Sequence, residues 1–186
     1  MNQIFQVNPD HRRQMDALGI DCFAAAMAYD EGRVMREARG RKTIRVDAGD
    51  GEVWYLKRHF LPASNPIRSA LDEFEMIGEL TLVQVQCPEL VAVGSGNVDT
   101  LPCSFLITRA VPDGVPLDSW LAQAEEDGRG SPEEMQRLST KLAAFARRFH
   151  DTGYHHKDFY LCHIFVHREK PLEHEFVLID LQRVSR

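Results

Sequence analysis

Hydrophobic and polar residues change their spacing several times along the chain, and each change predicts a different kind of element. The N-terminal segment looks helical, and Asp21 is a candidate cap before the small apolar run 22–27. Segments 34–46 and 52–57 carry the β-branched and aromatic residues that are typical of strands. Between them, residues 48–51 are rich in glycine and aspartate, which tolerate a positive φ, so we expect a tight turn there.

A helix is predicted next, because Asn65 is a good N-terminal cap and Pro66 suits the first helical position. Hydrophobic residues then recur at helical spacing, at Leu71, Phe74, Ile77 and Leu80 or Thr81. Two more strands are predicted at 87–93 and 103–108, with the glycine-containing segment 94–97 as the loop between them. This half of the chain is therefore rich in β-structure and has one internal helix.

The second half follows a turn at 111–114, which we interpret as the boundary between two lobes. Residues 131–134 form a capping box with proline at the first helical position, and they predict a long helix that ends near Gly153. Two short apolar strands, 164–166 and 176–179, are expected after this helix. The second half is therefore mainly helical, with a small hairpin.

The order of these elements predicts an α+β fold with a β-rich lobe at residues 1–110 and a helical lobe at residues 111–186. A chain of 186 residues can form two small lobes, and its hydrophobic content of 44% is enough for a packed core. The net charge of -6 argues against a general nucleic-acid-binding protein, which would carry a basic surface.

Four cysteines are scattered without a CxxC pair, which is typical of reduced cysteines in a cytosolic protein rather than of a disulfide framework or a zinc site. The first residues lack the apolar core of a signal peptide, and no apolar run is long enough to span a bilayer. We therefore expect a soluble, cytoplasmic protein, whose contact with the inner face of the cytoplasmic membrane would be peripheral.

The strongest chemical signal is the segment 155–163, which follows the long predicted helix and precedes the hairpin. His156, Lys157 and Asp158 occupy the first three places of the kinase catalytic-loop pattern H-R-D-x-x-x-x-N. His163 occupies the place of the asparagine. An aspartate at this position can accept the proton of an acceptor hydroxyl, while the later residue lies on the metal side. The alternative is a polar loop in which these side chains only bond the backbone.

Two more positions fit a kinase. Asp180 closes an apolar strand shortly after Asp158, where kinases hold their magnesium-binding aspartate, although aspartate is also common in turns. Lys57 ends a predicted strand in the β-rich lobe, the kind of place that holds a phosphate-binding lysine, although most lysines are simply solvated. Glu73 and Glu75 on the next helix are both candidates to pair with this lysine.

A glycine-rich phosphate-binding loop is missing from the sequence. The segment 39–42 is basic, and its Arg41 is a candidate phosphate contact, but a solvated hairpin tip is an equally good interpretation. There is no G-x-G-x-x-G and no Walker A pattern.

These motifs resemble one family in particular, the lipopolysaccharide core heptose kinases, or WaaP group, of the Kdo/WaaP kinases. Residues 150–163 are very similar to that family's catalytic loop, above all in the run Phe-Tyr-Leu-Cys-His at 159–163. Residues 178–183 resemble its metal-binding strand end, where a longer polar residue replaces a glycine. Upstream, residues 41–45 and 55–59 resemble its second and third strands.

The resemblance implies a protein-kinase-like fold that uses ATP and Mg²⁺ and phosphorylates a heptose hydroxyl of the lipopolysaccharide inner core. Residues 73–80 resemble the family's glutamate-containing helix, which selects Glu73 as the partner of Lys57. The implied roles are catalytic for Asp158, Lys157 and His156, cofactor-binding for Lys57, Glu73 and Arg41, and metal-binding for His163 and Asp180. A glycolipid or sugar is the implied substrate, and nucleic acid is not.

The chain departs from the family after Asp180, because it ends at Arg186 whereas the family continues through several more helices. We therefore expect an incomplete helical C-lobe, either because the chain is shortened or because a partner completes it. Two alternatives to a heptose kinase stay open. One is a kinase-like enzyme that acts on Kdo or another glycolipid hydroxyl, and the other is a non-catalytic pseudokinase or nucleotide-binding module.

Overall fold

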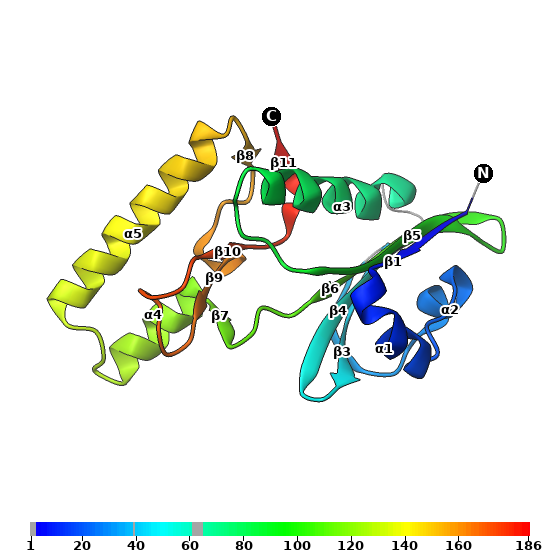
Figure 1. Cartoon of the computed structure of the whole chain (residues 1–186), viewed down its shortest axis with the longest axis horizontal. Coiled ribbons are helices and arrows are strands. Elements are labelled where there is room, and N and C mark those ends of the chain that lie inside the picture. The colour runs from blue at the N-terminus through cyan, green and yellow to red at the C-terminus, as the bar shows by residue number, and fades with distance from the viewer. Residues whose placement is uncertain (1–2, 39, 61–64) are drawn as a thin grey trace. The chain divides into compact units, whose positions relative to one another are not determined.

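The protein, in a computed structural model that describes residues 3–38, 40–60 and 65–186, divides into two compact units (Figure 1). Unit 1 comprises Met1–Ile77 and Glu89–Ala110, and unit 2 comprises Gly78–Pro88 and Val111–Arg186. The chain passes into unit 2 at residue 111, where the sequence predicts a boundary. Residues 78–88 differ from that prediction, because they belong to unit 2 although they precede the last two strands of unit 1.

Unit 1 is built on a six-stranded antiparallel sheet with the strand order β1-β5-β6-β4-β3-β2 (Figure 1). Its strands are β1 (Ile4–Val7), β2 (Arg33–Ala38), β3 (Arg41–Gly49), β4 (Glu52–His59), β5 (Leu90–Val98) and β6 (Leu101–Arg109). Strand β4, which carries Lys57, lies between β3 and β6 in the middle of this sheet. Because β4 is hydrogen-bonded on both sides, the backbone that carries Lys57 is held rigidly.

One face of the sheet carries the hydrophobic core of unit 1. After the turn η1 (Pro9–His11), the helices α1 (Arg12–Ala17) and α2 (Phe23–Ala28) supply Met15 and Phe23 to this core, and the segment between the two helices supplies Ile20. From the sheet, Trp54 and Leu56 are fully buried in it. Because neighbouring side chains of a strand point to opposite faces, Lys57 projects from the other face.

The N-terminal segment is less helical than its sequence predicts. Residues 4–7 form β1, which pairs with the distant strand β5, so a tertiary pairing overrides the local pattern. The cap of α2 is Cys22 rather than Asp21, since the Cys22 Sγ accepts a hydrogen bond from the Ala25 N–H at 3.5 Å.

The predicted strand 34–46 is in fact two strands, β2 and β3, which pair antiparallel with each other. Arg39, part of the basic segment singled out in the sequence, lies outside the described residues. The predicted turn at 48–51 is confirmed. Gly49, Asp50 and Gly51 have φ values of 86°, 52° and 77°.

The predicted loop 94–97 is wrong, because β5 runs straight through it and the turn lies at Asp99 and Thr100. Gly94 is required by close packing within the sheet and does not form a turn. A Cβ at this position would lie 2.4 Å from the ring of Phe105, so only glycine lets β5 and that ring approach so closely.

Helix α3 (Pro66–Leu82) begins as the sequence predicts, with the Asn65 Oδ1 accepting a hydrogen bond from the Arg68 N–H at 3.2 Å. Its buried positions are Ala70, Glu73, Ile77 and Leu80. Leu71 and Phe74 are only partly buried. The buried side of α3 therefore includes one carboxylate among its apolar residues, which marks Glu73 as a residue with a particular partner.

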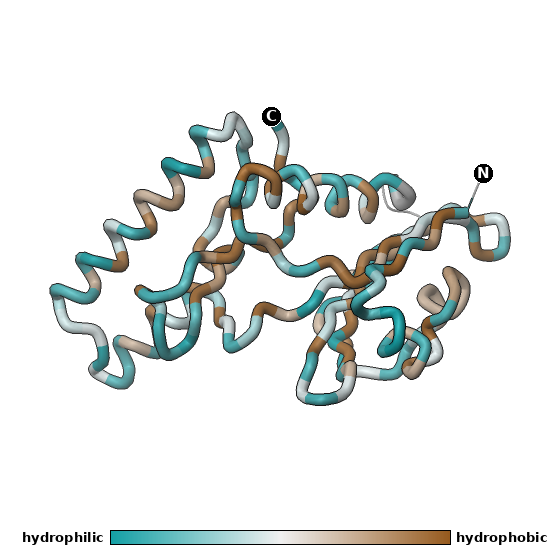
Figure 2. The backbone as a smooth tube through the Cα atoms, viewed as in Figure 1, coloured by the Kyte–Doolittle hydropathy of each residue, from teal (hydrophilic) through white to brown (hydrophobic). Residues whose placement is uncertain are grey.

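Unit 2 contains two helices, α4 (Leu117–Glu126) and α5 (Pro132–Asp151), and short strands in two small sheets. Helix α4 is not predicted from the sequence. Helix α5 is predicted, and its cap is confirmed by a 3.1 Å hydrogen bond from the Glu134 N–H to the Ser131 Oγ. Figure 2 shows hydrophobic residues recurring along α5, and Phe145 and Phe149 among them are buried. The C-terminal glycine, Gly153, has a φ of 82°.

The small sheets of unit 2 arrange the predicted catalytic segment. Their strands are β7 (Gly114–Pro116), β8 (His155–His156), β9 (Ile164–His167), β10 (Val177–Leu178) and β11 (Val184–Ser185), with the turns η2 (Leu161–His163) and η3 (Leu181–Arg183). Strand β9 pairs with β10, which confirms the predicted hairpin, and β8 pairs with β11. Both pairings place the segment after β10 beside the segment before β9.

Candidate active site

The candidate residues form two groups, one in each unit. In unit 1, the Lys57 Nζ donates to the Glu73 Oε1 at 2.5 Å. The Lys57 side chain is 14% exposed and the Glu73 side chain is 2% exposed, so this is a buried ion pair. The alternative partner Glu75 is 57% exposed and pairs with Arg68 instead. Of the two glutamates that the sequence offers, Glu73 is therefore the one that holds the lysine.

Arg41 lies on the same face of the sheet as Lys57. In the register of β3 and β4, Thr43 is opposite Lys57 and Arg41 is opposite His59. Residues two positions apart on a strand share a face, and so do residues opposite each other on paired strands. The half-buried Arg41 therefore adds a second cation to the face that carries the ion pair.

In unit 2, His156 organises the predicted catalytic loop. Its ring is buried, its Nδ1 accepts the Asp158 N–H at 3.1 Å, and its Nε2 donates to the Ile179 carbonyl at 3.3 Å. These bonds require the neutral ring with its proton on Nε2. Burial lowers the pKa of His156 below its usual value, which favours the same form. His156 thus fixes the backbone of the loop and of the following strand end together.

The loop is also anchored to α5 by an aromatic stack. The ring of Phe159 lies 5.4 Å from that of Phe149, with an interplanar angle of 8°, and 6.3 Å from that of Phe145. Such contacts between large rings stabilise a loop in one position. Lys157, which lies in the chain between His156 and the stacked Phe159, is exposed. Its side chain is therefore accessible to a ligand or to solvent.

His163 and Asp180 come together at the far side of the loop. The His163 Nδ1 lies 2.8 Å from the Asp158 carbonyl, which can only accept, so this nitrogen carries a proton. The Nε2 then lies 3.9 Å from the Asp180 Oδ2. Asp180 itself has left-handed backbone angles, with φ 57° and ψ 54°. The Ile179 N–H donates to the His163 carbonyl at 2.9 Å and fixes this strand end.

Asp158, the predicted base, is bound by an arginine. The Arg183 Nη1 lies 2.7 Å from the Asp158 Oδ1 and 2.9 Å from its Oδ2. The Asp158 side chain is 19% exposed and that of Arg183 is 60% exposed. The structure therefore brings Asp158, His163 and Asp180 together and adds Arg183 to them.

The comparison with known families decides what kind of protein carries these two groups. A family model described as "Lipopolysaccharide kinase (Kdo/WaaP) family" matches residues 25–186, which include every candidate residue described above. The chain belongs to the lipopolysaccharide kinase (Kdo/WaaP) family.

Individual relatives agree with this assignment. A lipopolysaccharide core heptose(I) kinase WaaP of Pseudomonas aeruginosa is 30% identical over an alignment of 183 positions, and the match covers 90% of this chain and 67% of the relative. Its namesake in Escherichia coli is 28% identical over an alignment of 187 positions, and the match covers 90% of this chain and 68% of the relative. The chain thus spans about two thirds of the length of these kinases.

A solved structure described as WaaP in complex with acyl carrier protein matches this lipopolysaccharide kinase with a TM-score of 0.73 and 28% identity. The match covers 100% of this chain and 73% of the solved one. It confirms the α+β, protein-kinase-like fold that the sequence predicts. Among the described residues of this family member, no helix is long and apolar enough to cross a membrane.

Membership in a kinase family implies the use of ATP, and the carboxylate of Asp180 in unit 2 is the kind of ligand that magnesium prefers. Mg²⁺ is commonly held by one or two carboxylates together with the phosphates of the nucleotide, not by a cage of side chains. Within the described ranges, no group of three or more His, Cys, Asp or Glu side chains could hold a metal alone. Asp180 and His163 are the residues that could hold Mg²⁺ once the phosphates supply the remaining ligands.

Two functional features of this lipopolysaccharide kinase are missed by the sequence motifs. Arg183 belongs to the strand-end motif 178–183, but nothing in the motif says that its side chain bonds Asp158. Phe159 belongs to the loop motif, but its stack on α5 depends on the packing of unit 2. A long basic side chain shortly after Asp180 is the only local signal for the first of these contacts.

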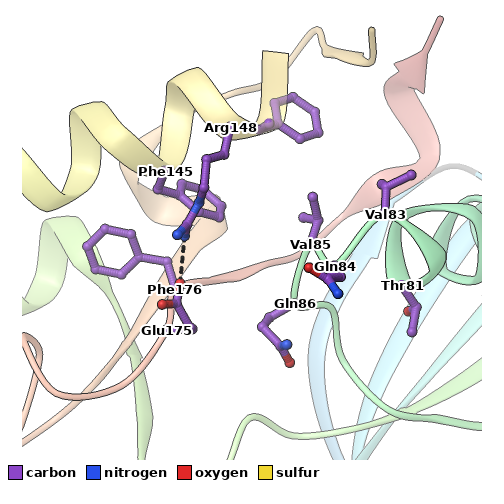
Figure 3. A pocket seen from close by; sticks show the side chains of 10 residues that line it. Thr81, Val83, Gln84, Val85, Gln86, Phe145, Arg148, Glu175 and Phe176 are labelled. Carbon is purple, nitrogen blue, oxygen red and sulfur yellow. Dashed lines mark hydrogen bonds and ion pairs between the residues drawn. The ribbon is translucent and has the colours of Figure 1, made fainter. Parts of the chain in front are cut away.

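The kinase also has an open pocket of about 490 Å³ in unit 2, beside α5 (Figure 3). Thr81, Val83, Gln84, Val85, Gln86, Phe145, Arg148, Phe149, Glu175 and Phe176 line it. The Arg148 Nη2 donates to the Glu175 Oε2 at 2.7 Å across it (Figure 3). None of the predicted site residues lines this pocket, so it is separate from the catalytic loop.

Proposed function

We propose that this chain is an ATP- and Mg²⁺-dependent kinase that phosphorylates a heptose hydroxyl of the lipopolysaccharide inner core. The family match over residues 25–186, which spans both groups of candidate residues, carries the proposal. The curated relatives in Pseudomonas aeruginosa and Escherichia coli are both described as heptose(I) kinases. Their description favours heptose over Kdo, which the family name also includes, as the acceptor.

Asp158 is the proposed base. As the acceptor oxygen forms its bond to the γ-phosphorus of ATP, the bond from that phosphorus to the oxygen of the departing ADP breaks. The acceptor hydroxyl gives its proton to the Asp158 carboxylate. The hydrogen bond from the Asp158 N–H to His156 and the stacking of Phe159 on α5 hold this residue in place. Lys157, exposed beside Asp158, is proposed to contact the reacting phosphoryl group.

The residues of unit 1 hold the nucleotide in this proposal. Lys57 binds phosphate oxygens, Glu73 keeps its ammonium group oriented through the 2.5 Å bond, and Arg41 supplies a further positive charge. Mg²⁺, when bound, neutralises the charge that develops on the transferred phosphate. Asp180 and His163 are its proposed ligands, with the His163 ring held in orientation by the Asp158 carbonyl.

The test is transfer of labelled phosphate from ATP to a lipopolysaccharide core acceptor by purified protein. Asp158→Asn should lose transfer but keep nucleotide binding, because the amide has nearly the same shape and cannot accept the proton. Asp151→Asn, at an exposed aspartate that ends α5, is the matched control and should transfer normally. Unchanged transfer by Asp158→Asn would show that the base is another residue. Nucleotide binding without transfer by the unmodified chain would favour the non-catalytic alternative.

A peripheral contact with the membrane fits the exposed edge strand β2. Val34 and Met35 are 46% and 47% exposed, and the exposed Arg33 and Arg36 flank them. The pairing of β2 with β3 shifts between Val34 and Arg36, which leaves Met35 without an opposite residue. Apolar side chains between arginines suit the surface of an anionic bilayer, where a lipid-linked acceptor would lie.

An acyl carrier protein is the first protein partner to test, because the solved relative is described in complex with one. Co-expression should raise the melting temperature of the purified chain and yield a stable complex in gel filtration. Separate elution and an unchanged melting temperature would argue against this partner.

A further inference from the structure

The contact between Arg183 and Asp158 occupies the place where an acceptor hydroxyl has to bind. Both oxygens of Asp158 already accept from the Arg183 Nη1, at 2.7 and 2.9 Å. A catalytic base must come within about 2.6–3.2 Å of the hydroxyl whose proton it removes. The guanidinium and the hydroxyl therefore share one carboxylate, and the acceptor reaches this base more readily once the arginine has moved away.

The backbone of Arg183 is held by hydrogen bonds to the neighbouring strand, whereas its side chain is mostly exposed to solvent. The Arg183 carbonyl accepts the Lys157 N–H at 3.2 Å, and the next residues pair with β8 through Val184 and His156. The side chain, in contrast, is 60% exposed. Both of its bonds to Asp158 use Nη1, so Nε and Nη2 remain as donors to a second oxyanion.

We propose that Arg183 binds an anionic group of the acceptor and, until that group arrives, covers the catalytic base. The substrate class is a saccharide whose accepting hydroxyl lies close to a phosphate or a carboxylate. This inference rests on the proposed kinase function and specifies its acceptor. A guanidinium recognises both kinds of anion through paired N–H donors, and such an anion is the group that draws it from Asp158.

The arrangement also protects ATP. While Arg183 bonds both oxygens, its guanidinium covers one side of the Asp158 carboxylate, so water reaches this base from fewer directions and is activated less as an acceptor. When the anionic saccharide takes the guanidinium, one oxygen of Asp158 becomes available to the hydroxyl. The hydroxyl proton moves to that oxygen as the phosphoryl group leaves ADP for the acceptor oxygen. Transfer to sugar is thereby favoured over hydrolysis.

The simpler explanation is that Arg183 only keeps Asp158 in position. A similar ion pair in the same unit serves as a control that distinguishes this explanation from the proposed role in acceptor binding. Arg148 bonds Glu175 at the same distance, 2.7 Å, and is 63% exposed. Both are exposed arginines that hold a carboxylate of unit 2. Arg148→Gln therefore reports what the loss of such an ion pair does to the fold alone.

The experiment compares Arg183→Gln, Arg183→Lys and Arg148→Gln in phosphate transfer and in ATP hydrolysis without acceptor. In Arg183→Gln, KM for an anionic acceptor should rise about tenfold or more, the loss expected for one charge-assisted contact. KM for ATP should not change, and acceptor-free hydrolysis should increase. Arg183→Lys should restore part of the acceptor affinity, and Arg148→Gln should behave as wild type. Equal melting temperatures would exclude loss of folding as the cause.

Three acceptors identify the anion: a neutral heptoside, a heptoside linked to a carboxylate-bearing ulosonic acid, and a phosphorylated heptoside. Wild type should prefer one or both anionic acceptors over the neutral one, and Arg183→Gln should lose that preference. If wild type transfers phosphate and Arg183→Gln keeps the preference and the low hydrolysis rate, the inference is wrong while the kinase function stands. If wild type transfers to none of them, the proposed function itself fails.

Discussion

Breaking the buried ion pair of unit 1 from one side should destabilise that unit strongly. Lys57→Met removes the ammonium group and leaves the carboxylate of Glu73, which is 2% exposed, without its partner. Among the described residues, the Glu73 Oε2 already has no hydrogen-bond partner, so the charge would have little else to stabilise it. Breaking a buried pair in this way costs about 3–5 kcal/mol. At about 2–4 °C per kcal/mol, the melting temperature should fall by about 6 °C or more.

The double variant Lys57→Met/Glu73→Leu should recover most of this loss, because an apolar pair can replace a buried ion pair at little cost. Glu73→Leu alone should be milder than Lys57→Met, since Lys57 is 14% exposed and can direct its ammonium group to water. Recovery of stability should not bring back nucleotide binding, which needs the lysine itself. The single and double variants together therefore distinguish the effect of the ion pair on stability from the effect of the lysine on nucleotide binding.

Urea unfolding followed by tryptophan fluorescence measures this cycle. The chain has two tryptophans, Trp54 in unit 1 and Trp120 in unit 2, so a Trp120→Phe background reports on unit 1 alone. Glu75→Gln, which breaks an exposed pair with Arg68, is the control and should change the free energy of unfolding by less than about 1 kcal/mol. If the double variant loses as much as the two single variants together, the pair is not coupled and the reasoning is refuted.

The remaining predictions concern acidity, membranes and a helix cap. Burial lowers the pKa of His156 below that of a free histidine side chain, so the unfolded chain takes up a proton there that the folded chain does not. The free energy of unfolding should therefore decrease as the pH falls below about 6.5, and His156→Gln should flatten that slope in pH-dependent urea titrations. Arg33→Gln and Arg36→Gln should each lower binding to anionic vesicles about fivefold in sedimentation, whereas Arg147→Gln should not. Equal losses in all three would indicate a nonspecific effect of charge. Ser131→Ala should destabilise the protein by about 1 kcal/mol in thermal unfolding, and an unchanged midpoint would mean that the cap bond to α5 contributes nothing.

The sequence predicts best what a few neighbouring residues decide. Asn65 and Ser131 are recognisable as caps because each side chain bonds a backbone group three residues away. The turn at Asp50 follows from residues that tolerate a positive φ. The catalytic segment is recognisable for a similar reason, since His156 and Asp158 interact within the loop itself.

What the sequence misses depends on partners that lie far away along the chain. Residues 4–7 become a strand because β5 is beside them, and Gly94 is set by the ring of Phe105. The bond between Arg183 and Asp158 exists because β8 and β11 pair in one register. Local patterns contain neither the register nor the packing, so these features need the folded structure.

The backbone of Asp180 has a consequence for how this protein can change over generations. A non-glycine residue with φ 57° costs about 1 kcal/mol, so the position favours glycine on grounds of stability alone. Aspartate tolerates these angles better than most residues, as Asp50, Asp99 and Asp113 also show, so a change to glycine would relieve only the small strain that remains. A glycine at this position in a related gene would lack the proposed metal ligand, and we would expect it only where catalysis is no longer selected.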